Sequence, residues 1–183
     1  MPDLDARPVA ELRARALTDP SAMEELLAQL RPLVLARCSR LLPCPADAEE
    51  AAQDALLSIA TRLGTFRGSG SFTGWVVVVA SNAARGTYRS LRRRSAEQGL
   101  AEPAEPVDPR TTSVIAGSRL DLLDALEQLE QAHPELVASF VLRDLAGLTY
   151  ADVAAETGVP LGTAQARVHR GRQFVRRRLR PEH

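Results

Sequence analysis

Residues 148–178 have the sequence LTYADVAAETGVPLGTAQARVHRGRQFVRRR, which indicates two helices joined by a sharp turn. Thr149 and Asp152 have the spacing of a capping box, so we expect the first helix to begin there. Gly158 supplies the positive φ that a tight turn requires. Pro160 and Thr163 suit the start of the next helix. A short helix, a glycine turn and a longer basic helix together predict a helix-turn-helix.

The second of these helices carries residue types that contact DNA. In a helix-turn-helix its N-terminal residues face base edges in the major groove. Glutamine pairs with adenine and arginine with guanine, so the candidates for base contacts are Gln165, Arg167, His169 and Arg170. The arginines that follow are candidates for phosphate contacts: Arg172, Arg176, Arg177, Arg178 and Arg180. A solvated basic helix end is the alternative, but seven arginines in residues 167–180 exceed what a helix dipole favours.

The residues upstream of this motif divide the chain into two domains. Leucines at helical spacing extend the second domain back to about residue 119. Residues 95–118 contain Pro103, Pro106, Pro109 and four acids, which excludes a continuous helix and predicts a flexible linker. We therefore expect an N-terminal tail at residues 1–19, one domain at 20–94, the linker at 95–118 and a second domain at 119–183.

The first domain is also helical by pattern. Apolar residues between positions 23 and 37 recur at helical spacing, and Pro43 and Pro45 interrupt them. Three acids, Asp47, Glu49 and Glu50, then lie in the first turn of a new helix, where the dipole favours them. Four valines within residues 75–80 favour a strand by propensity, but the sequence offers no partner strand, so we expect a buried helix start.

The predicted fold class is therefore all-α. We expect two small helical domains joined by a flexible, acidic, proline-containing linker, the second domain being a helix-turn-helix. Few aromatic residues and few β-branched runs argue against a β-sandwich or a barrel.

Charge is distributed in blocks, although the 183-residue chain has no formal net charge. All 23 basic residues are arginine, and 23 acids balance them. Residues 61–94 hold seven arginines and no acid, and residues 167–183 hold seven arginines and one acid. Two basic blocks on a neutral chain indicate a polyanion that is held at two places.

Composition excludes several classes of function. The absence of lysine excludes Schiff-base chemistry and a P-loop. No nucleophile–base pair appears, and Cys38 and Cys44 do not have the pattern of a zinc site, so we expect no enzyme, cofactor or metal. The longest apolar run, at residues 75–80, is too short to span a bilayer, and no signal peptide precedes it. We therefore expect a cytoplasmic protein with no membrane partner.

The first basic block lies downstream of a glycine-rich loop at residues 64–74. Arg85, Arg89 and Arg92 are about one helical turn apart and share a face, with Asn82 one turn before them. Aromatic residues beside a basic face suit unstacked single-stranded bases, and the candidates here are Phe66, Phe72 and Trp75. The alternative is that Phe72 and Trp75 are core residues.

Three segments, in this order, resemble extracytoplasmic-function (group IV) sigma factors of bacterial RNA polymerase. Residues 47–57, DAEEAAQDALL, are similar to the acidic helix of the family. Residues 72–89, FTGWVVVVASNAARGTYR, are similar to its helix for the minus-10 element, and residues 148–172 to its reader of the minus-35 element. The resemblance covers about residues 20–94 and 119–180.

The resemblance implies a role for each candidate residue. The residues implied to dock on the β′ clamp helices of core RNA polymerase are Asp47, Glu49, Glu50, Gln53 and Asp54. Those implied to open and hold the minus-10 element are Phe66, Arg67, Ser69, Ser71, Trp75, Asn82, Arg85 and Arg89. Those implied to read the minus-35 element are Thr163, Gln165, Arg167, His169, Arg170, Arg172 and Arg176. The β flap of the polymerase and an anti-sigma factor are further partners that the resemblance suggests.

Two residues depart from the family pattern. Gly86 stands where the family commonly has Asp, and Ala164 stands where it has Val. The alternative function is a free-standing helix-turn-helix regulator that binds DNA without polymerase, which would leave the acidic helix and the first basic block unused. An enzyme acting on nucleic acid would need a carboxylate cluster near the basic faces, and the sequence has none there.

Overall fold

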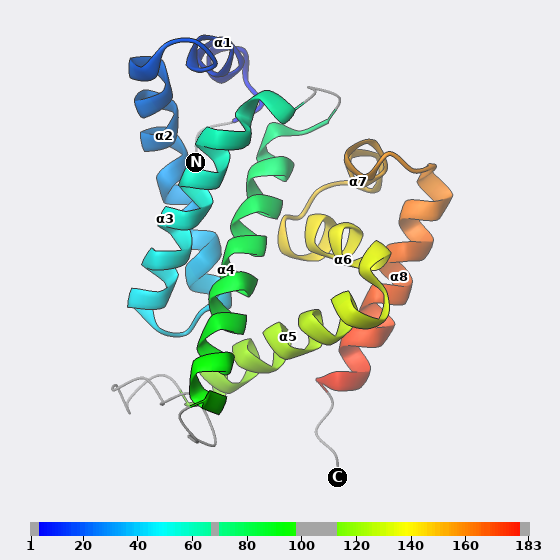
Figure 1. The fold of residues 1–183 in the computed structure, drawn as a ribbon. Coiled ribbons are helices and arrows are strands. Elements are labelled where there is room, and N and C mark those ends of the chain that lie inside the picture. Colours follow the sequence, from blue (N-terminus) through cyan, green and yellow to red (C-terminus); the bar gives the residue numbers. More distant parts are fainter. Residues whose placement is uncertain (1–3, 67–69, 98–112, 180–183) are drawn as a thin grey trace.

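The computed structural model describes residues 4–66, 70–97 and 113–179, and every regular element in these ranges is helical (Figure 1). The predicted all-α fold class is therefore confirmed. The elements are α1 (Arg7–Ala16), α2 (Pro20–Leu41), α3 (Pro45–Arg62), η1 (Leu63–Thr65), α4 (Phe72–Glu97), α5 (Ser113–Ala132), α6 (Pro134–Phe140), η2 (Val141–Leu145), α7 (Tyr150–Thr157) and α8 (Leu161–Arg178). In the part of the chain that the structure describes, no helix is long and apolar enough to cross a membrane.

Helices α1 to α4 form the first domain and pack around a common core. The inward face of α3 is made mostly of alanine, with Ala48, Ala51, Ala52 and Ala55 all buried. Such small side chains allow α2 and α4 to lie close to α3. Ile59 ends this stripe and is fully buried, as the helical spacing predicts.

The valine run lies in the first half of α4 and is helical, as predicted. Val76, Val77 and Val79 are buried, and Val78 is half-buried at the junction with the second domain. The strand propensity of valine is weak compared with the apolar surface that these side chains remove from water. Burial on a helix therefore outweighs the local preference.

The N-terminal segment differs from the predicted tail. Helix α1 packs on α2 through Val9, Leu12 and Ala16, whose spacing places them on one face. The carboxylate of Asp5 accepts hydrogen bonds from the Ser71 hydroxyl at 2.8 Å and from the Phe72 N–H at 2.5 Å. These two bonds satisfy groups at the start of α4, so the first domain begins before residue 20.

Both ends of the predicted linker are helical. Helix α4 continues to Glu97 and α5 begins at Ser113, so both helices enter the range 95–118. The three linker prolines lie within residues 98–112, outside the described residues.

Helices α5 to α8 form the second domain, and its turn chemistry agrees with the sequence. Thr149 and Asp152 form both hydrogen bonds of the capping box. Gly158 has φ of 66°, as the turn requires. Val153 and Val168 are fully buried between α7 and α8, so the helix-turn-helix has its own small core.

The two domains contact each other along α4 and α5 (Figure 1). Leu123 of α5 belongs to the core of the first domain, and Val78 of α4 packs on both smaller cores of the second. Gly74 permits a close approach, because a Cβ there would lie 2.6 Å from Cδ2 of Leu148. The halves therefore share a packed boundary in this structure.

Replacing Thr149 by Ala should lower the free energy of unfolding by about 1 kcal/mol, because the N-terminal N–H groups of α7 lose their acceptor. Thr61→Ala is the matched control, since Thr61 is exposed within α3 and bonds only to carbonyls of its own helix. Urea unfolding would measure both. Equal effects of the two substitutions would contradict the capping role.

Cys38 is fully buried, and burial raises the pKa of its thiol from 9.0 to about 11. A thiol reagent at pH 8 should therefore modify the half-buried Cys44 in the native chain and reach Cys38 only after unfolding. Since the native pKa lies above the unfolded one, this thiol should lower the free energy of unfolding as pH rises from about 9 to 11. Urea unfolding across this range would test it, and Cys38→Ala should remove that part of the slope.

Candidate nucleic-acid interface

Helix α8 presents one face to the core and another to solvent. Ala164, Val168, Gly171 and Val175 are buried, which orients the opposite side outward. Five predicted minus-35 residues are exposed: Thr163, Gln165, His169, Arg170 and Arg176. Nε2 of His169 lies 3.0 Å from Nε2 of Gln173, one turn later on the same face. This surface joins amide, imidazole and guanidinium groups, which suits base edges and phosphates.

Arg172 has a different environment from its neighbours. Its Nε donates to both carboxylate oxygens of Asp144, at 3.0 and 2.9 Å, and its Nη1 donates to the Tyr150 hydroxyl at 3.3 Å. The hydrogen bonds to Asp144 raise the pKa of Arg172 above its ordinary value. Arg172 therefore ties α8 to η2 and to the start of α7 within its own domain.

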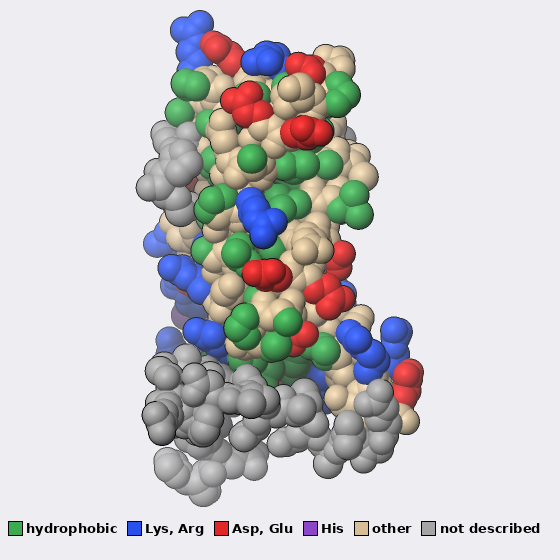
Figure 2. Space-filling view, turned by 90° about the vertical axis from the view of Figure 1, so that its left-hand side faces the viewer, with side chains coloured by type: hydrophobic (Ala, Val, Ile, Leu, Met, Phe, Trp, Pro, Cys, Tyr) green, Lys and Arg blue, Asp and Glu red, His purple; other side chains and the backbone are tan. Residues whose placement is uncertain are grey.

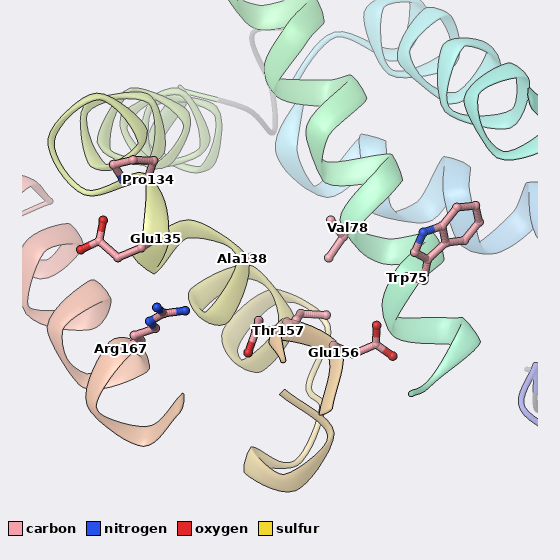
Figure 3. A pocket seen from close by; sticks show the side chains of 9 residues that line it. Trp75, Val78, Pro134, Glu135, Ala138, Glu156, Thr157 and Arg167 are labelled. Carbon is pink, nitrogen blue, oxygen red and sulfur yellow. The ribbon is translucent and has the colours of Figure 1, made fainter. Parts of the chain in front are cut away.

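Arg167 is half-buried and lines a cavity of about 310 Å³ between the domains (Figure 3). Glu135 and Ala138 of α6 lie near its side chain, whereas Trp75 and Val78 of α4 line the opposite wall. The structure thus separates Arg167 from the five outward residues of α8.

On α4, the residues predicted to hold a melted strand do share one face. Asn82 accepts a hydrogen bond from Arg85 at 2.5 Å. Arg85 and Arg89 both pair with Oε2 of Glu130, at 3.0 and 2.9 Å, and Arg92 pairs with Asp124. Helix α5 therefore supplies carboxylates to this face.

Burial makes Arg85 distinct within that face, since its side chain is only 7% exposed. Desolvation lowers the pKa of its guanidinium, and the nearby Glu130 carboxylate opposes this effect. Desolvation also raises the pKa of the adjacent Tyr88 phenol, and a hydrogen bond with Asp124 acts in the same direction. The centre of the predicted DNA face is therefore covered.

The aromatic residues near this face form a cluster. The ring centroid of Phe66 lies 5.3 Å from that of Phe72 and 5.9 Å from that of Trp75. Arg13 of α1 lies over two of these rings, with its guanidinium carbon 4.6 Å from the Phe66 centroid and 4.9 Å from that of Phe72. Phe72 is fully buried, so the alternative of a core residue holds for it. Phe66 and Trp75 are half-buried.

The loop residues of the predicted base pocket are only partly described. The Ser71 hydroxyl donates to Asp5, and the carboxylate of Glu156 of α7 lies against the neighbouring Gly70. Burial raises the pKa of Glu156 in this position. Arg67 and Ser69 lie outside the described residues.

The predicted polymerase-docking residues lie together along α3. Asp47 is half-buried, and four others are exposed: Glu49, Glu50, Gln53 and Asp54. Among the described residues, none of these five side chains has a hydrogen bond or ion pair. Figure 2 looks onto the side where α2 and α3 lie, and acidic side chains there lie among hydrophobic ones.

Sequence reasoning missed several residues that the structure brings to these surfaces. Leu57, one turn after Asp54, is 66% exposed and adds an apolar group to the acidic face of α3. Asp124 and Glu130 cover the arginines of α4. Acids at positions 124, 127 and 130 share one helix face by their spacing, but this spacing does not indicate which helix they oppose.

No group of three His, Cys, Asp or Glu residues in the described ranges could hold a metal ion.

Comparisons with known proteins identify the family of this chain. Residues 26–94 match the model of Sigma-70 region 2, and residues 119–175 match that of Sigma-70 region 4. RNA polymerase sigma factor CarQ of Myxococcus xanthus is 32% identical over 158 residues, which cover 86% of this chain and 89% of CarQ. ECF RNA polymerase sigma factor SigE of Mycolicibacterium smegmatis is 34% identical over 171 residues, which cover 88% of this chain and 64% of SigE.

A solved structure shares the fold. CnrH, in its complex with the cytosolic domain of CnrY, superposes with a TM-score of 0.50 at 22% identity, covering 91% of this chain and 94% of CnrH. A free-standing regulator would not explain the match to region 2 or the similarity to whole sigma factors. The chain therefore belongs to the extracytoplasmic-function sigma factors of the sigma-70 family, and it binds core RNA polymerase and directs it to promoters.

Proposed function

We propose that this sigma factor uses three separate surfaces, one for polymerase and two for the promoter. The acidic face of α3 docks on the β′ clamp helices, the arginine face of α4 holds the minus-10 strand, and the outward face of α8 reads the minus-35 element. The observation that carries this proposal is the segregation of charge. The acids of α3 lack partners within the described chain, whereas the arginines concentrate on α4 and α8.

The polymerase surface is supported by its composition. Glu49, Glu50 and Asp54 would repel DNA, so their face suits a basic protein surface. The exposed Leu57 beside them offers apolar area that an interface could bury. The β flap is the corresponding partner that we propose for the second domain.

The minus-10 surface is supported by its mixture of groups. Asn82 and Arg89 offer an amide and a guanidinium, and the half-buried Phe66 and Trp75 offer rings on which bases can stack. Ser71, with Arg67 and Ser69 of the same loop, would form the pocket for a flipped base. The buried Arg85 would orient Asn82 through their hydrogen bond.

The minus-35 surface is supported by the outward residues of α8. We place Thr163, Gln165, His169, Arg170 and Arg176 on DNA. Arg172 acts as a positioning residue, because Asp144 holds it. Arg167 joins the DNA surface only if the cavity between the domains opens.

The remaining expectations follow from the action of this chain as a polymerase subunit that directs promoter binding. We propose that the chain performs no covalent chemistry itself and acts in the cytoplasm, where polymerase meets promoters. An anti-sigma factor stays a predicted partner.

Reversing two exposed acids of α3, Glu49→Arg and Glu50→Arg, should abolish co-elution with core polymerase on gel filtration without DNA. The reason is that two attractive charges become repulsive at the docking surface. Glu24→Arg with Glu25→Arg is the matched control, an adjacent exposed pair on α2. Undiminished co-elution of the α3 variant would refute the docking surface.

Arg170→Ala should weaken holoenzyme binding to promoters selected from random DNA by about 1–3 kcal/mol relative to scrambled DNA, if Arg170 reads a base. Its free energy of unfolding should stay unchanged, because Arg170 is exposed. Arg172→Ala should instead lower the free energy of unfolding, by about 0.5–1 kcal/mol, through loss of the Asp144 pair. An equal loss on selected and scrambled DNA for Arg170→Ala would assign that residue to a phosphate.

A further inference from the structure

We propose that the free chain occludes its own minus-10 surface, with the carboxylates of α5 occupying the places that DNA phosphates take in the open form. This inference rests on the proposed function, since it assumes that the arginines of α4 face DNA. It adds a regulatory contact within the chain that needs no second protein.

The ion pairs between the domains carry the proposal. Glu130 binds Arg85 and Arg89 at once, and Asp124 binds Arg92 one turn further along α4. Every arginine that the sequence placed on the α4 face thus pairs with a carboxylate of α5. A carboxylate bound to a guanidinium presents oxygen acceptors as a phosphate does, so the two compete for the same donors.

Contacts on both sides of these ion pairs hold α5 in place. Arg37 of α2 donates to the carbonyl oxygen of Leu145, at the end of η2. Leu123 of α5 is fully buried in the core of the first domain. A Cβ on Gly74 of α4 would lie 2.6 Å from Cδ2 of Leu148, so the two segments approach closely here. The carboxylates are therefore fixed over the arginines by packing as well as by charge.

The described edge of the predicted base pocket, at Gly70 and Ser71, is covered in the same state. The carboxylate of Glu156 of α7 lies so close to this loop that a Cβ at Gly70 would meet it. On the other side, the carboxylate of Asp5 accepts hydrogen bonds from the Ser71 hydroxyl and the Phe72 N–H. Asp5 belongs to the first domain, so movement of the second domain would uncover only the side of Ser71 that faces Glu156.

The exposed ion pairs between α4 and α5 are weak enough for this contact to open. Arg89 and Arg92 are 49% and 54% exposed, so their ion pairs are weak and sensitive to salt. A polymerase that binds both domains at separated sites binds only the open form, and its binding energy shifts the population toward that form. Free sigma factor would then stay off single-stranded DNA, and holoenzyme would expose the α4 face.

The test measures binding of the full chain, without polymerase, to a fluorescein-labelled mixed-sequence single strand of about 20 nucleotides. Asp124→Asn with Glu130→Gln removes both covering charges and keeps side-chain shape. If about a tenth of the wild-type chain is open, this variant should bind about tenfold more tightly. Its radius of gyration in X-ray scattering should also increase.

The matched control is Glu24→Gln with Glu25→Gln, which removes the same charge from exposed positions on α2. It should change the affinity less than about twofold, since only long-range charge is altered. Adding Arg89→Ala and Arg92→Ala to the α5 variant should erase its gain. Occlusion is refuted if the α5 variant binds like the control or if its gain survives loss of the arginines.

Folding and function are separated by two further measurements. Should the double variant lose its helical circular dichroism, Asp124→Asn alone is used, because its partner Arg92 is half exposed. This single variant should still gain about threefold in affinity, and no gain would overturn the proposal. Promoter melting by holoenzyme with Arg89→Ala tests the proposed function independently, because holoenzyme is open whether or not the free chain is occluded.

Discussion

The buried guanidinium of Arg85 is the constraint on which the arrangement of the two domains depends. A charge removed from water in this way requires a partner of opposite sign. Arg85 finds it 45 residues away, on Glu130. Glu130 can reach it only when α5 crosses α4, and this crossing takes Leu123 into the first core and brings Val78 against the second.

Tertiary packing places the arginines of this neutral chain in different environments. Arg85 is buried and positions Asn82, and Arg172 is held by Asp144 within its own domain. Arg170 and Arg176 remain exposed on α8. The acids divide in the same way, because Asp124 and Glu130 of α5 pair with arginines of α4, whereas the acids of α3 have no such partner among the described residues. The surfaces proposed for polymerase and for the promoter thus keep part of their charge unpaired within one neutral chain.

Much of the fold was predictable because its signals are local. The capping box at Thr149, the positive φ of Gly158 and the buried helical valines each depend on residues within a few positions of one another. The role of residues 1–19 was missed although Val9, Leu12 and Ala16 have helical spacing, because the short helix gains its stability by packing on α2. The ion pairs of α5 with the arginines of α4 were not predicted, because residues as far apart as 85 and 130 leave no local pattern in the sequence.

The sequence by itself determined the all-α class, the helix-turn-helix and the positions of the two arginine blocks, since helix periodicity and turn chemistry act over short stretches. The family assignment follows from the same local motifs. Only the tertiary structure decided which arginines are free, which are paired and which are buried. The physical reason is that an ion pair between α4 and α5 depends on how two cores pack together, and residue spacing along either helix carries no information about that packing.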